Sequence, residues 1–151
     1  MLEALLCMSL NIYFEARSES VHGQIAVAEV TLNRVQSDEY PNSICGVVLQ
    51  ENKDGCQFSW WCDGRSDKPK EINSFQRSKA IAKLMIEEGK YISVVGKEVT
   101  HYHTEDVTPY WSANYTPVIQ VGKHIFYKKT IPKPLPRPDN LVELIQGEHN
   151  E

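Results

Sequence analysis

Hydrophobic residues recur at helical spacing over the first 14 positions of the chain. They follow one another at intervals of three and four, which predicts a helix. Glu15 comes directly after two aromatic residues, Tyr13 and Phe14, and Glu19 lies one helical turn further along. If the helix continues, the two glutamates share a face; if it ends at Ser18 or Ser20, Glu15 lies in its last turn.

A second apolar stripe predicts a helix over residues 21–35. Its members step by three and four, and Ser20 is a suitable N-cap: Val21, Ile25, Ala28, Leu32 and Val35. The two helices therefore form an angled or antiparallel pair with Glu15 and Glu19 at the corner. Asn33 and Arg34 are polar at positions where partial burial is expected. Three roles remain open for them: capping of the helix, an ion pair between Arg34 and Glu19, and substrate binding.

Further along, the pattern predicts one more helix and a strand pair. Asn73 and Gln76 form a capping-box signature for a helix over residues 74–88, with Ile81, Leu84 and Met85 facing inward and Gly89 ending it. Residues 118–127 alternate around Gly122-Lys123, as in a hairpin. The apolar run 44–49 is too short to assign to helix or strand.

These elements predict a mainly helical α+β domain with a small β-sheet, over residues 1–130. After Lys129 the composition changes, because residues 131–138 hold four prolines and are typical of an extended polyproline segment. We therefore expect residues 131–151 to be a Pro-rich extension that ends in a short C-terminal helix.

Composition limits the kinds of partner. The chain has 151 residues, 41% of them hydrophobic, and a net charge of −4. This fits one globular domain, which we expect to be monomeric, and it argues against nucleic-acid binding. No apolar run is long enough to span a membrane, so membrane insertion is not expected. The N-terminal run lacks a basic flank and carries Glu3, unlike a signal peptide.

The four cysteines differ in their surroundings. Cys7 lies among apolar residues at helical spacing, where a small buried side chain is the simplest interpretation. Cys56 and Cys62 bracket five residues and are positioned to form a disulfide in an oxidising compartment. Their spacing does not fit a zinc knuckle. Cys45 has no assigned partner.

Glu15 is the strongest candidate for chemistry. A carboxyl group beside two aromatic rings is partly desolvated, which raises its pKa and allows it to hold a proton that it can donate. A glycosidic-bond acid needs this property. The alternative is an amphipathic helix whose glutamates simply face solvent.

Aromatic and amide side chains form a second candidate region. Gln57, Phe58, Ser59, Trp60 and Trp61 suit sugar stacking and hydroxyl recognition. One of the two tryptophans is expected in the core instead.

Three histidines suggest a metal hypothesis. His101 and His103 share a face if they lie in a strand, and His124 follows later. No carboxylate or cysteine falls at a ligand spacing nearby, so core packing or substrate hydrogen bonding is favoured over a metal, and no cofactor is expected.

Eight short motifs, in order, resemble the spore-cortex-lytic, SleB-like cell-wall hydrolase family over about residues 4–128. They are Tyr13-x-Glu15-Ala16-Arg17-x-Glu19, Gly23-Gln24-x-Ala26-Val27-Ala28, Asn33-Arg34-Val35, Ile44-Cys45-Gly46-Val47-Val48, Gln57-Phe58-Ser59-Trp60, Thr100-His101-Tyr102-His103, Pro109-x-Trp111 and Gly122-x-His124-Ile125-Phe126-Tyr127. The resemblance implies a lysozyme-like, transglycosylase-type fold acting on peptidoglycan, with Glu15 as catalytic acid.

The sequence departs from the family in two ways. Family members usually have glycine where this chain has Ser18. A spore enzyme would also carry an export signal, so a chain starting at this helix is expected to be a domain expressed alone or a phage endolysin. It would act on the cell wall or in the periplasm, and an endolysin would stay in the host cytoplasm until lysis.

The function expected from the residues and the resemblance together is cleavage of the β-1,4 bond between N-acetylmuramic acid and N-acetylglucosamine. A lytic transglycosylase needs only Glu15, as acid and then base, and gives 1,6-anhydromuramic products. Glu19 is then an orienting residue paired with Arg17 or Arg34. The expected substrate-binding residues are Glu19, Asn33, Gln57, Phe58, Ser59, Trp60, His101, Tyr102, Trp111 and Tyr127.

Three alternatives remain open. A muramidase would use a second carboxylate as nucleophile or base. A metal-dependent amidase or peptidase would be built on His101, His103 and His124. A glycan-binding module without turnover would use Trp60, Trp61 and Trp111.

Overall fold

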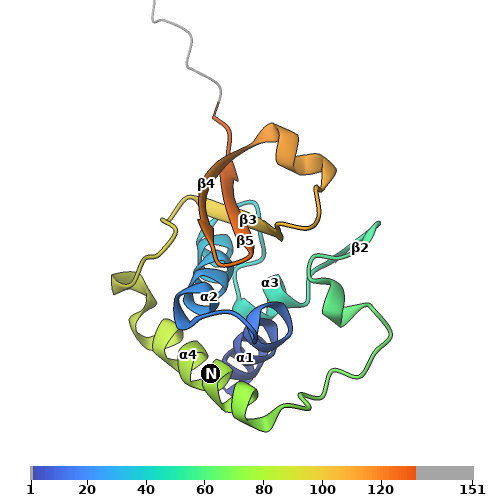
Figure 1. The fold of residues 1–151 in the computed structure, drawn as a ribbon, viewed down its shortest axis with the longest axis vertical. Helices are drawn as coiled ribbons and strands as arrows, with labels where there is room; N and C mark the ends of the chain where they lie inside the picture. Colours follow the sequence, from blue (N-terminus) through green and yellow to red (C-terminus); the bar gives the residue numbers. More distant parts are fainter. Residues whose placement is uncertain (1, 132–151) are drawn as a thin grey trace, which may run out of the picture.

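The computed structural model describes residues 2–131, in which helices form one part and a small sheet the other (Figure 1). The elements in chain order are α1 (Leu2–Ala16), α2 (Val21–Gln36), α3 (Ile44–Val48), β1 (Glu51–Asn52), β2 (Gly55–Cys56), the 3-10 helix Ser59–Trp61, α4 (Ile72–Glu88), the 3-10 helix Gly89–Tyr91, β3 (Val99–Thr104), the 3-10 helix Tyr110–Asn114, β4 (Tyr115–Val121) and β5 (His124–Lys129). Apart from Ile131, the Pro-rich extension lies outside the described residues, and so does the short C-terminal helix that was predicted for it.

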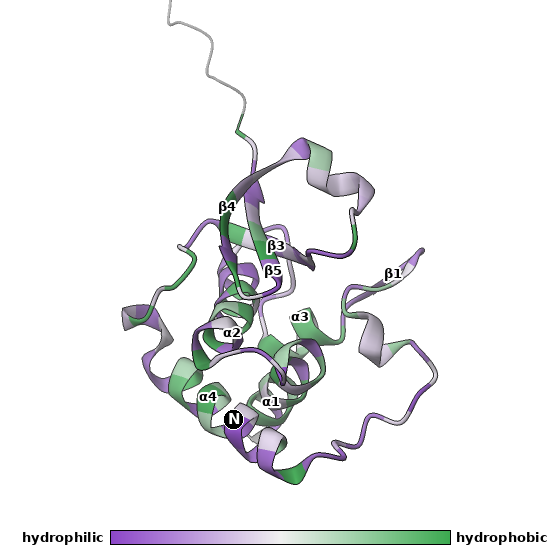
Figure 2. Cartoon of the chain, viewed as in Figure 1, coloured by the Kyte–Doolittle hydropathy of each residue, from purple (hydrophilic) through white to green (hydrophobic). Residues whose placement is uncertain are grey.

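Three helices share one hydrophobic core. Met8 and Ile12 of α1 pack with Ala28 of α2 and with Ile81 and Met85 of α4, all of them buried. Figure 2 shows hydrophobic stretches along α2, α3 and α4, whereas much of the connection that leads into α4 is hydrophilic. Burial of these apolar side chains stabilises the angle between α1 and α2, and with it the corner that carries Glu15.

The three-stranded sheet is antiparallel, in the order β3-β5-β4. Phe126 of the central strand is fully buried and packs with Ala26, Val27 and Val30 of α2. The β4–β5 pair turns at Gly122, whose φ of 58° is in the left-handed region that glycine adopts at little cost. The predicted strand pair is therefore confirmed, although β4 begins three residues earlier than expected.

The segment between α2 and α4 is fixed by two disulfides. Cys56 and Cys62 form the pair that their spacing suggests. Cys7 is buried, as predicted, but it is not an unpaired apolar side chain: it bonds to Cys45 in α3, with a Cα–Cα distance of 5.3 Å. The partner was missed because it lies 38 residues away and becomes adjacent only when α3 packs on α1.

Helix α4 corrects two expectations. It begins at Ile72, two residues before the predicted start, and its N-cap Glu71 makes no side-chain capping bond, so the capping box at Asn73 is not used. Instead, the Tyr13 hydroxyl accepts hydrogen bonds from the backbone N–H groups of Lys70 and Glu71, at 3.1 and 3.0 Å. Leu84, predicted to face inward, is exposed.

No helix within residues 2–131 is both long enough and apolar enough to cross a membrane.

Candidate active site

Glu15 lies in the last turn of α1, at the corner where the chain turns into α2. The helix ends at Ala16, and Ser20 caps the next helix by accepting a hydrogen bond of 3.2 Å from the Gly23 N–H. The break separates Glu15 from Glu19, so the two glutamates do not continue along one helical face. Of the two arrangements that the sequence allows, the structure has the one with Glu15 at a helix end.

The carboxyl group of Glu15 is half-buried beside Tyr102 of β3. The Tyr102 hydroxyl donates a hydrogen bond of 2.8 Å to Glu15 Oε1. Burial raises the pKa of Glu15, and this effect exceeds the opposite effects of the Tyr102 hydrogen bond and the Arg34 charge. A carboxyl group in this state can hold a proton at a pH where an ordinary glutamate has lost it.

Three adjoining hollows share Glu15 in their walls. The largest, about 710 Å³, runs along Phe14, Ser59 and Trp60 toward basic residues of the 63–71 segment. A second, about 450 Å³, is bordered by Ser18 and Ser74. A third, about 100 Å³, lies on the side of the sheet and is bordered by Arg34 and Trp111. Glu15 is therefore accessible to a ligand that extends in more than one direction.

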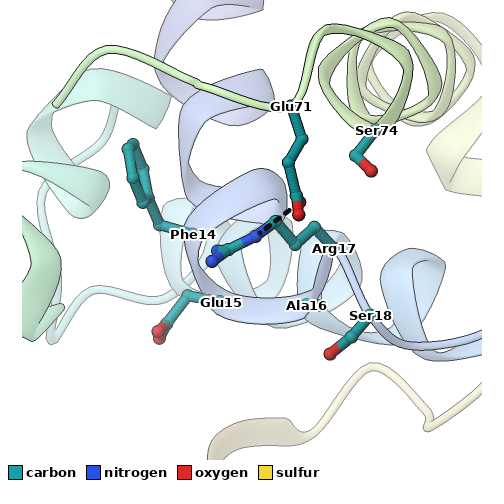
Figure 3. A pocket seen from close by; sticks show the side chains of 7 residues that line it. All are labelled: Phe14, Glu15, Ala16, Arg17, Ser18, Glu71 and Ser74. Carbon is teal, nitrogen blue, oxygen red and sulfur yellow. Dashed lines mark ion pairs between the residues drawn. The ribbon is translucent and has the colours of Figure 1, made fainter.

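An ion pair borders the first two hollows. The Arg17 Nε lies 3.0 Å from Glu71 Oε2, and both side chains are exposed. Figure 3 shows the Glu71 side chain directed at Arg17, while that of Glu15 points away from this pair. Tyr13, whose hydroxyl bonds the start of α4, contacts the Arg17 guanidinium with its ring, 4.8 Å from Cζ to centroid. Neither Glu71 nor Tyr13 was predicted from the sequence to border the site.

Most of the expected binding residues lie around these hollows, although Phe58 and Trp60 are almost fully buried. Gln57, Phe58, His101, Tyr102 and Trp111 border the smallest hollow, and Ser59 borders the largest. Trp60 contributes an edge there, but it is only 5% exposed. Its ring stacks on Phe14 at 5.0 Å and its Nε1 donates to Asn11 Oδ1 at 2.9 Å. Trp60 is therefore the core tryptophan of the adjacent pair, and Trp61 is the exposed one.

Glu19 has different partners from those expected. Its Oε1 accepts a hydrogen bond of 3.1 Å from the Lys123 backbone N–H and lies 3.1 Å from His124 Nδ1. It pairs with neither Arg17 nor Arg34. Its Oε2 occupies the space that a Cβ on Gly122 would need, so glycine is required there for room as well as for its φ. Glu19 thus fastens the β4–β5 turn to the corner between α1 and α2.

Asn33 and Arg34 fix β3 to α2. The Asn33 amide donates to the backbone oxygens of Gly96 and Val99, at 2.9 and 2.7 Å, and its side chain is not brought to Glu15. The Arg34 Nε donates to the Thr100 oxygen at 2.8 Å. These bonds set the position of the strand that presents Tyr102 to Glu15. In the sequence, their polar character and the Asn33-Arg34-Val35 motif singled out both residues, but neither signal gave their partners.

The three histidines do not come together as a metal site. His103 Nε2 lies 2.7 Å from the Tyr127 hydroxyl, and His101 Nδ1 lies 3.0 Å from Thr100 Oγ1. Burial, with the nearby Arg34 charge, lowers the pKa of His101 to about 4. Across residues 2–131 the one cluster of three possible ligands is Glu51, Cys56 and Cys62, and its cysteines are joined to each other. The Tyr127 hydroxyl is hydrogen-bonded to His103, and Tyr127 borders none of the three hollows.

Residues 18–127 match the model of the Cell Wall Hydrolase family, a match that begins just after Glu15. The spore cortex-lytic enzyme of Oceanobacillus iheyensis is 29% identical over 131 residues, which are 80% of this chain and 40% of that protein. The spore cortex-lytic enzyme of Bacillus cereus is 27% identical over 121 residues, or 42% of its length. The chain thus spans less than half the length of these relatives.

Two solved structures are similar over more of the fold. The catalytic domain of the germination-specific lytic transglycosylase SleB from Bacillus anthracis has a TM-score of 0.68 and 30% identity, covering 85% of this chain and 96% of that domain. The Bacillus cereus SleB catalytic domain has a TM-score of 0.67 and 30% identity, covering 85% and 91%. The expected α+β, lysozyme-like fold is confirmed. The chain belongs to the Cell Wall Hydrolase family.

Proposed function

We propose that this chain cleaves the β-1,4 bond between N-acetylmuramic acid and N-acetylglucosamine in peptidoglycan, as a lytic transglycosylase with Glu15 as acid and then base. The observation that carries the proposal is the state of Glu15: half-buried, raised in pKa, and open to three hollows. The likeness to SleB catalytic domains supports the same reaction.

The reaction needs one carboxyl group used twice. Glu15 donates its proton to O4 of the N-acetylglucosamine unit as the bond from muramic C1 to O4 breaks and its electron pair moves to O4. The Glu15 carboxylate then takes the proton of the muramic C6 hydroxyl while O6 bonds to C1. This closes the 1,6-anhydro ring, returns the proton to Glu15 and consumes no water.

Tyr102 and Arg34 assist both halves of this cycle. Each favours the ionised form of Glu15, through a hydrogen bond and a positive charge respectively, and so opposes the effect of burial. The pKa is thereby kept between that of a free glutamate and that of a fully desolvated one, which suits a group that must both give and take a proton.

The positions of the other acids favour transglycosylation over the two-carboxylate muramidase. Glu19 is engaged with His124 and the β4–β5 turn. Glu71 shares two hollows with Glu15, but its carboxylate is held by Arg17. Asp63 borders the largest hollow from an exposed loop. A muramidase needs a second, ionised carboxylate that is free to act as nucleophile or base on the sugar, whereas Glu19 and Glu71 are each held by other partners.

The remaining expected residues take different parts in this proposal. Gln57, Ser59, His101, Tyr102 and Trp111 contact the glycan, whereas Glu19, Asn33, Phe58, Trp60 and Tyr127 support the surfaces that do. We propose further that residues 2–131 contain the whole catalytic unit, and that it acts on the bacterial cell wall as a monomer.

Substitution of Glu15 tests the proposal. Glu15→Gln keeps the size and hydrogen bonding of the side chain but removes the transferable proton, so release of soluble fragments from purified peptidoglycan should fall by about 10²–10⁴ or more. Glu71→Gln is the matched control, since Glu71 borders two of the same hollows, and it should lower the release of fragments far less. Activity should persist in a metal chelator. Near-normal turnover by Glu15→Gln would refute the assignment, and loss of activity in chelator would point to the histidine-based amidase instead.

A further inference from the structure

Arg34 is a buried cation held in a fixed orientation. The residue is 5% exposed, and its Nε donates to the Thr100 backbone oxygen at 2.8 Å. Its Cζ lies 5.0 Å from the centre of the Tyr40 ring and 5.2 Å from that of Phe58. The backbone bond and the two rings fix the guanidinium, so its remaining donors point in set directions.

One of those donors is unused. Arg34 Nη1 is buried and has no hydrogen-bond partner among residues 2–131. Nor does any carboxylate in that part of the chain form an ion pair with Arg34. A buried donor without an acceptor destabilises the folded state, because it has lost its water and gained nothing in return. An acceptor supplied by a ligand would remove this cost.

The hollow beside Arg34 defines the size of such a ligand. It measures about 100 Å³ and also has Glu15, Phe58, Tyr102 and Trp111 in its walls. A hollow of this size takes a substituent of a few heavy atoms rather than a disaccharide unit. The group must carry an acceptor oxygen for Arg34, and its other atoms face aromatic side chains. It must also lie close to the bond on which Glu15 acts.

The acetamido group of the substrate meets these conditions. This step rests on the proposed function. In peptidoglycan the acetamido group is attached to C2, next to the C1 at which the bond breaks, and consists of a nitrogen, a carbonyl and a methyl group. We propose that Arg34 binds the acetamido carbonyl oxygen of the muramic acid unit whose C1–O4 bond Glu15 breaks. The methyl group then packs against Trp111, which borders the same hollow.

A neutral ligand suits this position better than an anionic one. Arg34 lowers the pKa of Glu15 by its charge, and a carboxylate bound to it would cancel that effect. The lactyl substituent of muramic acid is attached one carbon further from C1 and continues into the peptide, so it exceeds the size of the hollow. The acetamido group accepts a hydrogen bond from Arg34 without neutralising it, so the positive charge of Arg34 still stabilises the Glu15 carboxylate.

The test measures binding rather than turnover, so its outcome does not depend on that of the proposed reaction. In a Glu15→Gln background, calorimetry compares chitotetraose, which carries acetamido groups and no lactyl group, with cellotetraose, which has the same β-1,4 backbone and neither group. We expect chitotetraose to bind about tenfold or more tightly. Arg34→Lys, which keeps the charge but loses the planar donors, should remove most of this preference. Arg77→Lys, on the exposed face of α4, should leave it unchanged.

Two results would overturn the inference. One is a preference for chitotetraose that survives in a folded Arg34→Lys protein. The other is sensitivity to Arg34→Lys only for a peptide-free muramic tetrasaccharide, which would assign Arg34 to the lactyl carboxylate. If Arg34→Lys does not fold, a crystal structure of Glu15→Gln with chitotetraose decides: an acetamido oxygen about 3 Å from an Arg34 nitrogen supports the inference, and one elsewhere refutes it.

Discussion

The hydrogen bond from Tyr102 to Glu15 offers a sensitive test of the proposed acid. It is 2.8 Å long and joins the sheet to the end of α1. Tyr102→Phe removes the hydroxyl while keeping the ring, which packs near Phe58, His124 and Phe126. The substitution therefore changes the environment of Glu15 without opening a large cavity.

The expected change in the Glu15 pKa follows from the charge of its two states. The Tyr102 hydroxyl bonds the ionised carboxylate more strongly than the neutral acid, so its loss raises the pKa of Glu15 above its already raised value. A hydrogen bond to a charged group contributes about 1.5–3 kcal/mol, and one pKa unit corresponds to about 1.4 kcal/mol. Because the neutral acid also accepts part of this bond, we expect a net rise of about one unit.

A pH–rate profile measures this change. The first step requires protonated Glu15, so kcat/KM falls as the pH rises through the pKa of Glu15 in the free enzyme. In Tyr102→Phe the alkaline limb should move upward by about one pH unit. The maximum rate of Tyr102→Phe should also fall, because Tyr102 no longer donates a hydrogen bond to the Glu15 carboxylate that forms when Glu15 gives up its proton. Release of soluble fragments from peptidoglycan gives the rate.

The matched control is Tyr127→Phe. Its hydroxyl lies 2.7 Å from His103 Nε2, in the same sheet but without a bond to Glu15. The alkaline limb of this variant should stay in place. An unmoved limb in Tyr102→Phe, or one displaced to lower pH, would refute the reasoning that Glu15 acts first as an acid and that Tyr102 favours its ionised form.

Three further predictions concern stability. Glu15→Gln should unfold at a higher temperature than the wild type at neutral pH, because burial penalises the Glu15 carboxylate. The difference in unfolding temperature should vanish as the pH falls below 4.5, the ordinary pKa of a glutamate. A wild type that is more stable than Glu15→Gln at neutral pH would contradict this. Trp60→Ala should cost about 3–5 kcal/mol in denaturant unfolding, since it removes a core ring and leaves Asn11 unpaired; a loss below about 1 kcal/mol would place Trp60 outside the core. Replacing Cys56 and Cys62 by serine should cost about 2–3 kcal/mol, and four free thiols in the oxidised wild type would exclude the bond.

The features predicted well from the sequence are those with local causes. The periodicity of residues 21–35 and the Ser20 cap gave the second helix, and alternation around Gly122-Lys123 gave the hairpin. The position of Glu15 after Tyr13 and Phe14 suggested a shielded acid, and the pKa of Glu15 is raised by burial.

The features that could not be predicted depend on which distant residues become neighbours. Nothing in the pattern pairs Cys7 with Cys45, or Glu19 with His124, because each pair forms only after separate elements pack. Arg34 illustrates the same limit: like its neighbour Asn33 it bonds the backbone of β3, but only Arg34 also borders the hollow beside Glu15. A helix places neighbouring residues about 100° apart, so adjacency does not imply a shared role.

The central claim is that Glu15 alone breaks the glycosidic bond without consuming water. Mass spectrometry of the fragments released from purified peptidoglycan by the wild-type protein tests it most directly. The account predicts 1,6-anhydromuramic ends, lighter by one water molecule than hydrolysed ends. When the digestion is carried out in ¹⁸O-labelled water, these ends should contain no label. Reducing muramic ends that carry ¹⁸O would contradict the account and require a second carboxylate acting on water.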